Sequence, residues 1–509
     1  TDVGELAPTA GSNPALSAHG AFKLLIASQL LKKLRQRPLR SALTDDQRAW
    51  RNIELLAGSA SLAKLIDSLN CSSATAFMLP TSCLAPLAML GIWRTGRRVV
   101  PLNFLVSEDD RAHIFADSEA DTCVTVRPMV EMFGPPPPGV RVIYLEDMPR
   151  RLWNGILATR PTPDEVATLL YTSGTSGKPK GVELTHGNLI ANVSQAMRAA
   201  KFTSDDCIFG VLPQFHSFGF TVLTLLPMTV GCRVVYSAKF VPAKVLSLLQ
   251  KHRPSFLVMI PSMYASLVRD RKASKDMFSS VRIAVSGGEA LPPTVREQFL
   301  DRFGVEIHEG YGLTETSPAA HISLPWASRL GTVGKALPEV ETRIVDPGGA
   351  VLPAGQDGEV HLRGPNVMRG YHGMPEATAK VLDANGWFRT GDMGQLDDEG
   401  YLTITGRIKE MLIVGGENVF PREIESVLEL HPDVDACGVI GRADEKRGEV
   451  PVAFVELREG ASPQPSELRS WSSDRLAPYQ CPRDIVVVEN LPRNPTGKVQ
   501  RRELHALLS

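Results

Sequence analysis

The sequence lacks several features that would place it in a common class of protein. Its seven cysteines are scattered and include no C-x-x-C pair, so we expect neither a disulfide framework nor a zinc site. No apolar run reaches the roughly 18–20 residues that a membrane span needs, and the closest approach is 218–228, "FGFTVLTLLPM". A net charge of −1 gives no reason to expect a nucleic acid partner. Reduced cysteines favour a cytoplasmic protein.

The N-terminal segment contains a basic amphipathic stretch at 21–37, "AFKLLIASQLLKKLRQR". Its apolar stripe is formed by Phe22, Ile26, Leu30 and Leu34, and its basic end by Lys32, Lys33, Arg35 and Arg37. Such a helix either docks on its own domain, with cations at its C-terminal end, or lies peripherally on an anionic membrane. The chain begins with threonine, so residues 1–39 are interpreted as a native N-terminus or as part of a trimmed fusion.

The 509 residues are sufficient for more than one domain. Residues 40–405 alternate short β-branched runs with helical stretches, which is typical of a layered α/β domain. After residue 410, short strands and two or three helices indicate a small α+β domain. The sequence therefore predicts an N-terminal segment at 1–39, a large domain at 40–406 and a small C-terminal domain at 407–509.

A loop rich in glycine and hydroxyl residues, "YTSGTSGKPKG" at 171–181, follows an apolar strand. Glycines let a backbone approach phosphate, and hydroxyls and lysines supply hydrogen-bond donors. The loop does not fit G-x-x-x-x-G-K-[ST], because Thr172 occupies the first glycine position and Pro179 follows Lys178. The sequence therefore predicts a phosphate-binding loop of another design.

Four further stretches occur downstream in a fixed order: "GGEALP" (287–292), "EGYGLTETSP" (309–318), "GWFRTGDMGQLDDEGYLTITGRIKE" (386–410) and "NPTGK" (494–498). Together with the glycine loop they resemble the adenylate-forming superfamily of acyl- and aryl-CoA synthetases, peptide-synthetase adenylation domains and firefly-type luciferases. The resemblance covers the chain from roughly residue 40 to the end. It implies a large layered α/β domain with a small, mobile α+β C-terminal domain.

The resemblance also implies two half-reactions at one site. A carboxylic acid attacks the α-phosphate of ATP in the presence of Mg²⁺, which gives an acyl adenylate and pyrophosphate. The thiol of CoA, or of the phosphopantetheine on a carrier protein, then attacks the acyl carbonyl and expels AMP. Such chemistry depends mainly on neutralising charge.

The nucleotide-binding residues that the resemblance implies lie in four of the five stretches. Those around the phosphates are Thr172, Ser173, Gly174, Thr175, Ser176, Gly177 and Lys178. Those around the adenine are Gly288, Glu289, Ala290, Glu309 and Tyr311. The ribose is assigned to Asp392 and Arg407.

The remaining roles concern catalysis and domain motion. The resemblance assigns the α-phosphate to Thr314, Mg²⁺ to Glu315, the edge of the acid pocket to His216, and a bridge between the acid and the α-phosphate to Lys498. It assigns the hinge to Lys409 and the passage of the thiol arm to Gly415 and Gly416. Each assignment has a simpler alternative. The two glycines also fit a tight hairpin turn, and Lys498 with Arg501 and Arg502 also fits a solvated basic tail.

The acid is expected to be a medium- or long-chain fatty acid, because 218–228 and the stretch "SFLVMIPSMYASLV" at 255–268 supply apolar walls. The pattern is most similar to bacterial fatty-acyl-CoA or acyl-ACP synthetases, and an aryl-acid ligase of the benzoate or coumarate type is the rival. A peptide-synthetase module is less expected, since no carrier domain follows Lys498. A catalytically silent nucleotide-binding protein is disfavoured, because Glu315, Asp392, Arg407 and Lys498 are all present.

Overall fold

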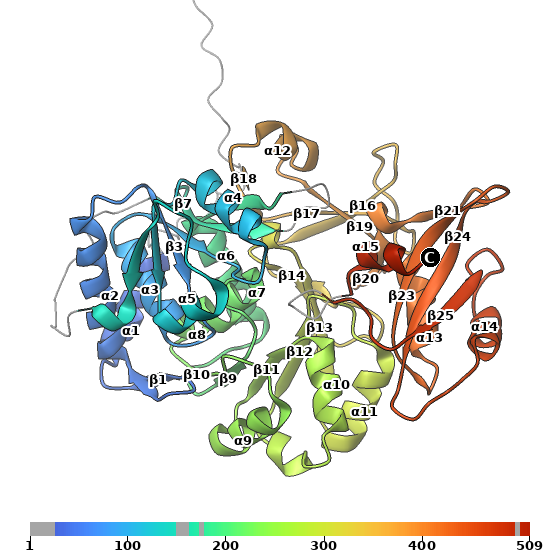
Figure 1. Cartoon of the computed structure of the whole chain (residues 1–509), viewed down its shortest axis with the longest axis horizontal. Coiled ribbons are helices and arrows are strands. Elements are labelled where there is room, and N and C mark those ends of the chain that lie inside the picture. Colours follow the sequence, from blue (N-terminus) through green and yellow to red (C-terminus); the bar gives the residue numbers. More distant parts are fainter. Residues whose placement is uncertain (1–25, 149–161, 173–177, 494–498, 509) are drawn as a thin grey trace, which may run out of the picture.

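The structure is a computed structural model, and it describes residues 26–148, 162–172, 178–493 and 499–508. Two large sheets form the N-terminal domain, which occupies the blue-to-yellow part of Figure 1. The first contains, in spatial order, β15 (Lys335–Ala336), β14 (Ala319–Ile322), β13 (Ile307–Gly312), β12 (Ile283–Gly287), β11 (Phe256–Met259), β9 (Cys207–Gly210), β10 (Arg233–Tyr236), β1 (Ser41–Thr44) and β2 (Ala49–Arg51). The second contains β18 (Gly370–Tyr371), β8 (Lys180–Thr185), β7 (Val166–Thr172), β4 (Arg98–Pro101), β3 (Ala74–Met78), β5 (Thr122–Thr125) and β6 (Arg141–Tyr144).

Helices pack around these sheets, and most central strands run parallel, so the predicted α/β fold is confirmed. The helices of this domain are α1 (Ile26–Gln36), α2 (Asn52–Ser68), α3 (Leu84–Arg94), α4 (Glu108–Ser118), α5 (Arg127–Phe133), α6 (His186–Ala199), α7 (Ser217–Phe220), α8 (Leu226–Val230), α9 (Pro242–His252), α10 (Pro261–Arg269), α11 (Pro293–Phe303) and α12 (Pro375–Val381). In the part of the chain that the structure describes, no helix has the length and apolarity to cross a bilayer.

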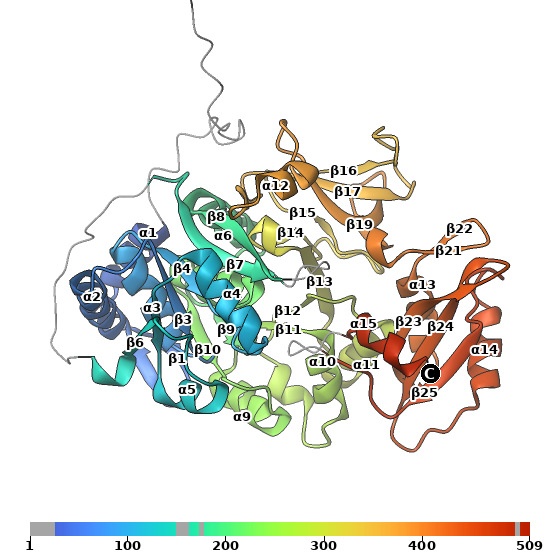
Figure 2. The same cartoon turned by 45° about the horizontal axis from the view of Figure 1, so that its top comes forward.

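A smaller antiparallel sheet leads to the C-terminal domain. Its strands are β16 (Glu341–Val345), β17 (Gly358–Arg363), β19 (Phe388–Leu396) and β20 (Leu402–Arg407). The short turn η6 (Ile408–Glu410) follows β20 directly. The C-terminal domain, drawn in orange and red in Figures 1 and 2, then folds from β21 (Leu412–Val414), β22 (Glu417–Val419), α13 (Pro421–Glu429), β23 (Val434–Asp444), β24 (Gly448–Leu457), α14 (Pro465–Ser473), β25 (Asp484–Val488) and α15 (Arg501–Leu504).

Helix α1 is part of the large domain. Its stripe residues Ile26, Leu30 and Leu34 are only 0%, 1% and 3% exposed, and the helix packs against α2 and α8. Phe22 lies outside the described residues. Because the apolar stripe is buried in the domain's own core, the docked alternative holds. The predicted membrane contact through this stripe is wrong.

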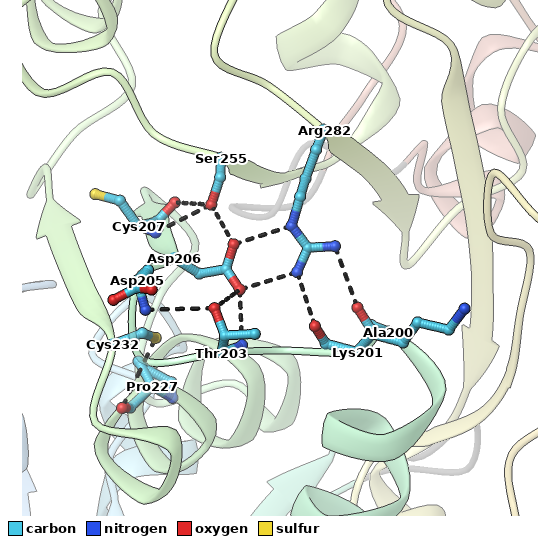
Figure 3. A network of polar contacts seen from close by, with 10 residues as sticks. All are labelled: Ala200, Lys201, Thr203, Asp205, Asp206, Cys207, Pro227, Cys232, Ser255 and Arg282. Carbon is cyan, nitrogen blue, oxygen red and sulfur yellow. Dashed lines mark hydrogen bonds and ion pairs between the residues drawn. The ribbon is translucent and has the colours of Figure 1, made fainter.

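A polar network connects the amino ends of neighbouring strands of the first sheet, as Figure 3 shows. Asp206, Ser255 and Arg282 directly precede β9, β11 and β12, whose parallel strands begin at the same edge. Arg282 donates from Nε and Nη2 to the two carboxylate oxygens of Asp206, at 2.9 Å each, and Ser255 donates to the same carboxylate at 2.7 Å. Arg282 also donates to the carbonyls of Ala200 and Lys201, just after α6. The opposite, carboxyl edge of these strands is where ligands bind in open α/β sheets.

Candidate functional site

The adenine-side residues meet at the carboxyl edge of β12 and β13. The register pairs Ser286 with Glu309, so the turn after Gly287 begins beside Glu309. The backbone N–H of Leu291 donates to Glu309 Oε2 at 3.1 Å, which fixes the predicted residues Gly288, Glu289 and Ala290 against that carboxylate. Gly288 has φ +88°, and an added Cβ would meet nothing closer than Ile260 at 3.9 Å, so the backbone there is open to a ligand.

The Glu309 carboxyl group lies in a poorly solvated position. Burial raises its pKa, and the Leu291 N–H and the positive charges of Arg422 and Arg296 offset only part of that rise. Arg422 belongs to α13, so the C-terminal domain contributes to the electrostatics of the adenine side. A carboxyl group with a raised pKa suits an acceptor that faces the neutral edge of a base rather than a cation.

Tyr311, which is assigned to the adenine, forms one polar cluster with the predicted ribose residues Asp392 and Arg407. Tyr311 donates its hydroxyl to Asp392 Oδ2 at 2.7 Å, and Arg407 Nε lies 2.6 Å from Asp392 Oδ1. Strand pairing explains the second contact, because Asp392 on β19 lies opposite Arg407 on β20. Burial, and then the Asp392 charge, raises the pKa of Tyr311 well above its ordinary value, so the phenol remains a donor at neutral pH. The arrangement offers a buried acceptor with a partly exposed cation beside it.

Two predicted residues occupy the short turn η5 (Thr314–Thr316). Thr314 is assigned to the α-phosphate and Glu315 to Mg²⁺. Glu315 Oε1 accepts a 2.8 Å hydrogen bond from the Tyr371 hydroxyl, and Thr314 donates to Ser217 Oγ at 3.2 Å. Sequence reasoning did not single out Tyr371 or Ser217 as site residues. The local signals that could have found them are their places in "RGYH" (369–372) and "FHSFG" (215–219).

The described residues contain no cluster of three or more metal-binding side chains. Glu315 nevertheless fits Mg²⁺, because this ion keeps few protein ligands and is bound by one or two carboxylates together with substrate phosphates. The hard oxygen of Glu315 beside Thr314 is therefore suited to a nucleotide-bound ion rather than to a resident metal.

A cavity of about 1510 Å³ opens beside the turn after β12 and is lined by Gly287, Gly288 and His216, among other residues. His216 Nδ1 accepts a 3.4 Å hydrogen bond from the Phe218 N–H, which orients the ring. The His216 side chain is exposed to the cavity. The surrounding protein desolvates the ring and thereby lowers the pKa of His216. The ring is therefore neutral at physiological pH.

The apolar walls differ in part from those predicted. Of the stretch 218–228 only Phe218 lines the cavity, whereas Phe220, Leu223 and Leu225 are buried in the core. The stretch 255–268 contributes Ile260, Ser262, Met263 and Ser266. The wall that sequence reasoning missed comes from distant segments and includes Leu84, Leu87, Phe104, Met129, Met132 and Phe133.

The other predicted residues are placed less directly. Thr172 and Lys178 flank the glycine loop, while 173–177 and Lys498 lie outside the described residues. Gly415 and Gly416 form an exposed turn between β21 and β22 with φ +63° and +92°, so the hairpin alternative describes their geometry here. Lys409 lies in η6 between the two domains. The roles assigned to these residues stay predictions.

Comparisons with known proteins identify the family of the chain. Residues 30–372 match the family model described as AMP-binding enzyme, and 423–498 match AMP-binding enzyme C-terminal domain. A feruloyl-CoA synthase of Amycolatopsis sp is 34% identical over 425 residues, 81% of this chain and 84% of that protein. A long-chain-fatty-acid–CoA ligase of Bacillus subtilis (strain 168) is 36% identical over 345 residues, 67% of this chain and 61% of that protein.

The solved structures point the same way. MatB from Rhodopseudomonas palustris in its ATP-bound form is 28% identical, covers 95% of this chain and 99% of its own, and has a TM-score of 0.86. Its apo form, with 29% identity and the same coverage, has a TM-score of 0.78. The chain belongs to the AMP-binding enzyme family of adenylate-forming proteins. It is an AMP-forming acid–thiol ligase of the acyl-CoA synthetase type.

Proposed function

We propose that this ligase activates a medium- or long-chain fatty acid as its acyl adenylate and transfers the acyl group to the thiol of CoA or of a carrier protein. The observation that carries the proposal is the large, mainly apolar cavity that begins beside His216 and Gly288. Its volume exceeds the roughly 300–1,000 Å³ of common ligand pockets, which suits a long flexible chain. The Bacillus relative supports the same class of acid. The seven unpaired cysteines are consistent with a protein that acts in the reducing cytoplasm.

The nucleotide would lie across the edge of the first sheet. Tyr311 and the 288–290 turn enclose the adenine, Glu309 faces its amino edge, and Asp392 with Arg407 holds the ribose. The glycine loop between Thr172 and Lys178 would cover the β- and γ-phosphates. Mg²⁺, held by Glu315 and those phosphates, supplies neutralising charge when bound.

The acid would lie with its carboxylate at Thr314 and His216 and its tail in the cavity. A neutral His216 is suited to this place because it can orient a carboxylate by a hydrogen bond without trapping it in an ion pair. Attack on the α-phosphate builds negative charge, which Lys498 would neutralise. Rotation about Lys409 would then exchange Lys498 for the turn at Gly415 and Gly416 before the thiol attacks.

An aryl acid is the second candidate, and a specific feature favours it. Phe104, Phe133 and Phe215 form a cluster in the cavity wall, with ring centroids 4.5 and 4.9 Å apart. Such rings stack readily on an aromatic substrate. The feruloyl-CoA synthase relative, which aligns over most of both chains, supports this alternative.

The test is ATP–pyrophosphate exchange and thioester formation across a straight-chain series from C4 to C12. Each buried methylene contributes up to about 0.8 kcal/mol, or about fourfold in kcat/KM, so the values should climb until the pocket ends. A flat or falling series with benzoate, coumarate or ferulate fastest would establish the aryl ligase instead. If none of the acids supports pyrophosphate exchange, the result would indicate a catalytically silent nucleotide-binding protein.

A further inference from the structure

The two adjacent arginines of α15 have different surroundings. Arg502 is exposed and forms no ion pair with another described residue, as expected for a solvated basic tail. Arg501 is only 20% exposed in its side chain and faces into the C-terminal domain. The tail alternative is therefore wrong for Arg501, because its guanidinium is held by two carboxylates.

The contacts of Arg501 join three elements. Its Nε and Nη2 donate to the two oxygens of Glu425 on α13, at 3.1 and 2.8 Å. Its Nη1 donates to Glu410 Oε2 at 2.7 Å. Glu425 has a side chain that is only 3% exposed, and it also accepts the Val439 N–H of β23 at 2.9 Å. One guanidinium thus connects α15 to α13, β23 and the turn η6.

The positions of these partners in the chain are informative. Glu410 directly follows Lys409, the predicted hinge, and Arg501 lies three residues after Lys498. The chain on either side of 494–498 is also fixed, because Val499 pairs with Arg493 in an antiparallel bridge. Leu504, one turn beyond Arg501, is fully buried. The segment that leads from Lys498 is therefore anchored to the domain at two points.

We propose that Arg501 is a positioning residue for the adenylation half-reaction: it locks the segment that follows Lys498 to the turn that follows the hinge. The two then move as one body when the small domain rotates, and Lys498 arrives at the acid and the α-phosphate in a fixed place. A planar guanidinium can satisfy both carboxylates at once, whereas an ammonium group acts as a single point charge. This inference rests on the proposed function, which assigns Lys498 its role.

The test compares Arg501→Met with Arg502→Met, a matched change of the adjacent exposed arginine. A misplacement of about 1 Å can cost on the order of 100-fold in rate, so Arg501→Met should lower kcat for pyrophosphate exchange by about 10- to 100-fold. The KM for ATP should change little, because the nucleotide contacts lie mainly in the large domain. Thioester formation from supplied acyl adenylate should stay near normal. Arg502→Met should leave both half-reactions intact.

Three further variants separate positioning from folding. Glu410→Gln keeps the buried Arg501–Glu425 pair and weakens only the link to the hinge turn, so it should show the same split between half-reactions with an unchanged melting temperature. The double variant Arg501→Met/Glu410→Gln should exchange pyrophosphate no more slowly than Arg501→Met, because both changes break the same Arg501–Glu410 connection. Arg501→Lys should recover part of the exchange rate.

The inference is overturned if Arg501→Met slows both half-reactions equally, or if it behaves like Arg502→Met. Lys498→Ala, measured in parallel, distinguishes the two levels of the proposal. If Lys498→Ala loses exchange and Arg501→Met keeps it, only the positioning role fails. If Lys498→Ala exchanges normally, the mechanism proposed for this lysine fails, and an effect of Arg501→Met would then have to arise by another route.

Discussion

At the scale of single residues, Asp392, the proposed ribose acceptor, is held in place by two side-chain donors. Its side chain is 3% exposed, and each of its oxygens already has a donor, the Tyr311 hydroxyl on one side and Arg407 on the other. Because both donors are fixed by strands, the carboxylate is held in one orientation before any nucleotide arrives. Such preorganisation reduces the cost of binding.

Asp392→Ala is expected to weaken both half-reactions by removing the ribose acceptor. A hydrogen bond to a charged group contributes roughly 1.5–3 kcal/mol, which corresponds to about a 10- to 100-fold rise in the Kd for ATP. Calorimetric titration of ATP and the exchange assay would measure it. Asp398→Ala, which removes an exposed carboxylate on the same hairpin, serves as the control and should bind ATP normally. A well-folded Asp392→Ala protein with unchanged ATP affinity would remove Asp392 from the site.

At the scale of elements, the Asp206–Arg282 pair joins β9, β11 and β12 at the edge opposite the site (Figure 3). Burial alone would raise the pKa of Asp206, but hydrogen bonds from Arg282, the Thr203 N–H and Ser255 lower it below its ordinary value. A carboxyl group whose folded pKa is depressed stabilises the folded state above its unfolded pKa, near 3.9. That stabilisation is lost as the pH falls through the lower, folded value.

Asp206→Asn should therefore lower the free energy of unfolding by about 3 kcal/mol, the lower end for a buried pair, since Arg282 is 35% exposed. Urea unfolding of the wild type and the variant should show a constant difference between pH 5 and 8. This difference in the free energy of unfolding should narrow below pH 4, because Asp206 of the unfolded wild type takes up a proton there more readily than the folded carboxyl group does. A difference that stays the same down to pH 3 would show that the charge of Asp206 is not what holds the strands.

Elements with local signals were predictable from the sequence. Thr185 is of the residue type that favours a helix N-cap, and it caps α6 through its hydroxyl, which accepts the Asn188 N–H at 3.1 Å. The polar residues 45–48 between β1 and β2, and the prolines at the start of α11, are local signals of the same kind. The nucleotide side could be assigned because its residues lie in short contiguous motifs. Variants of those residues would test whether each one has its assigned role.

The acid pocket and the Arg501 network could not be predicted in the same way. The cavity walls come from segments more than 100 residues apart, such as Phe104 and Met263, and nothing local marks them as neighbours. Arg501 and Glu410 are separated by 91 positions and meet only because α15 returns to the hinge turn. The helix α1 had an amphipathic pattern that fits a membrane surface and a protein core equally well, and only the folded domain decides between them.

At the scale of the whole molecule, the two domains touch through a charged pair. Arg269, the last residue of α10, lies 2.7 Å from Asp435 near the start of β23 in the C-terminal domain. The chain is also more similar to MatB in its ATP-bound form than in its apo form, with TM-scores of 0.86 and 0.78. In this arrangement of the two domains, the Arg269–Asp435 pair lies at their boundary.

Arg269→Glu should disfavour this arrangement, because two carboxylates then face each other across the domain boundary. Exposed pairs contribute at most about 1 kcal/mol, and Arg269 is 60% exposed, so pyrophosphate exchange should fall by only about two- to fivefold. Thioester formation from supplied acyl adenylate should not fall, since in the proposed mechanism the small domain rotates away before that step. The effect should weaken in high salt, which screens surface charges.

The double variant Arg269→Glu/Asp435→Arg restores an attractive pair of reversed sign and should return the exchange rate toward that of the wild type. Arg271→Glu, which makes the same change of charge two residues further along at an exposed position, should leave exchange unaltered. If Arg271→Glu is as slow as Arg269→Glu, the effect belongs to the overall charge of the large domain. If the double variant is no faster than Arg269→Glu alone, the Arg269–Asp435 contact does not contribute to docking the domains for adenylation.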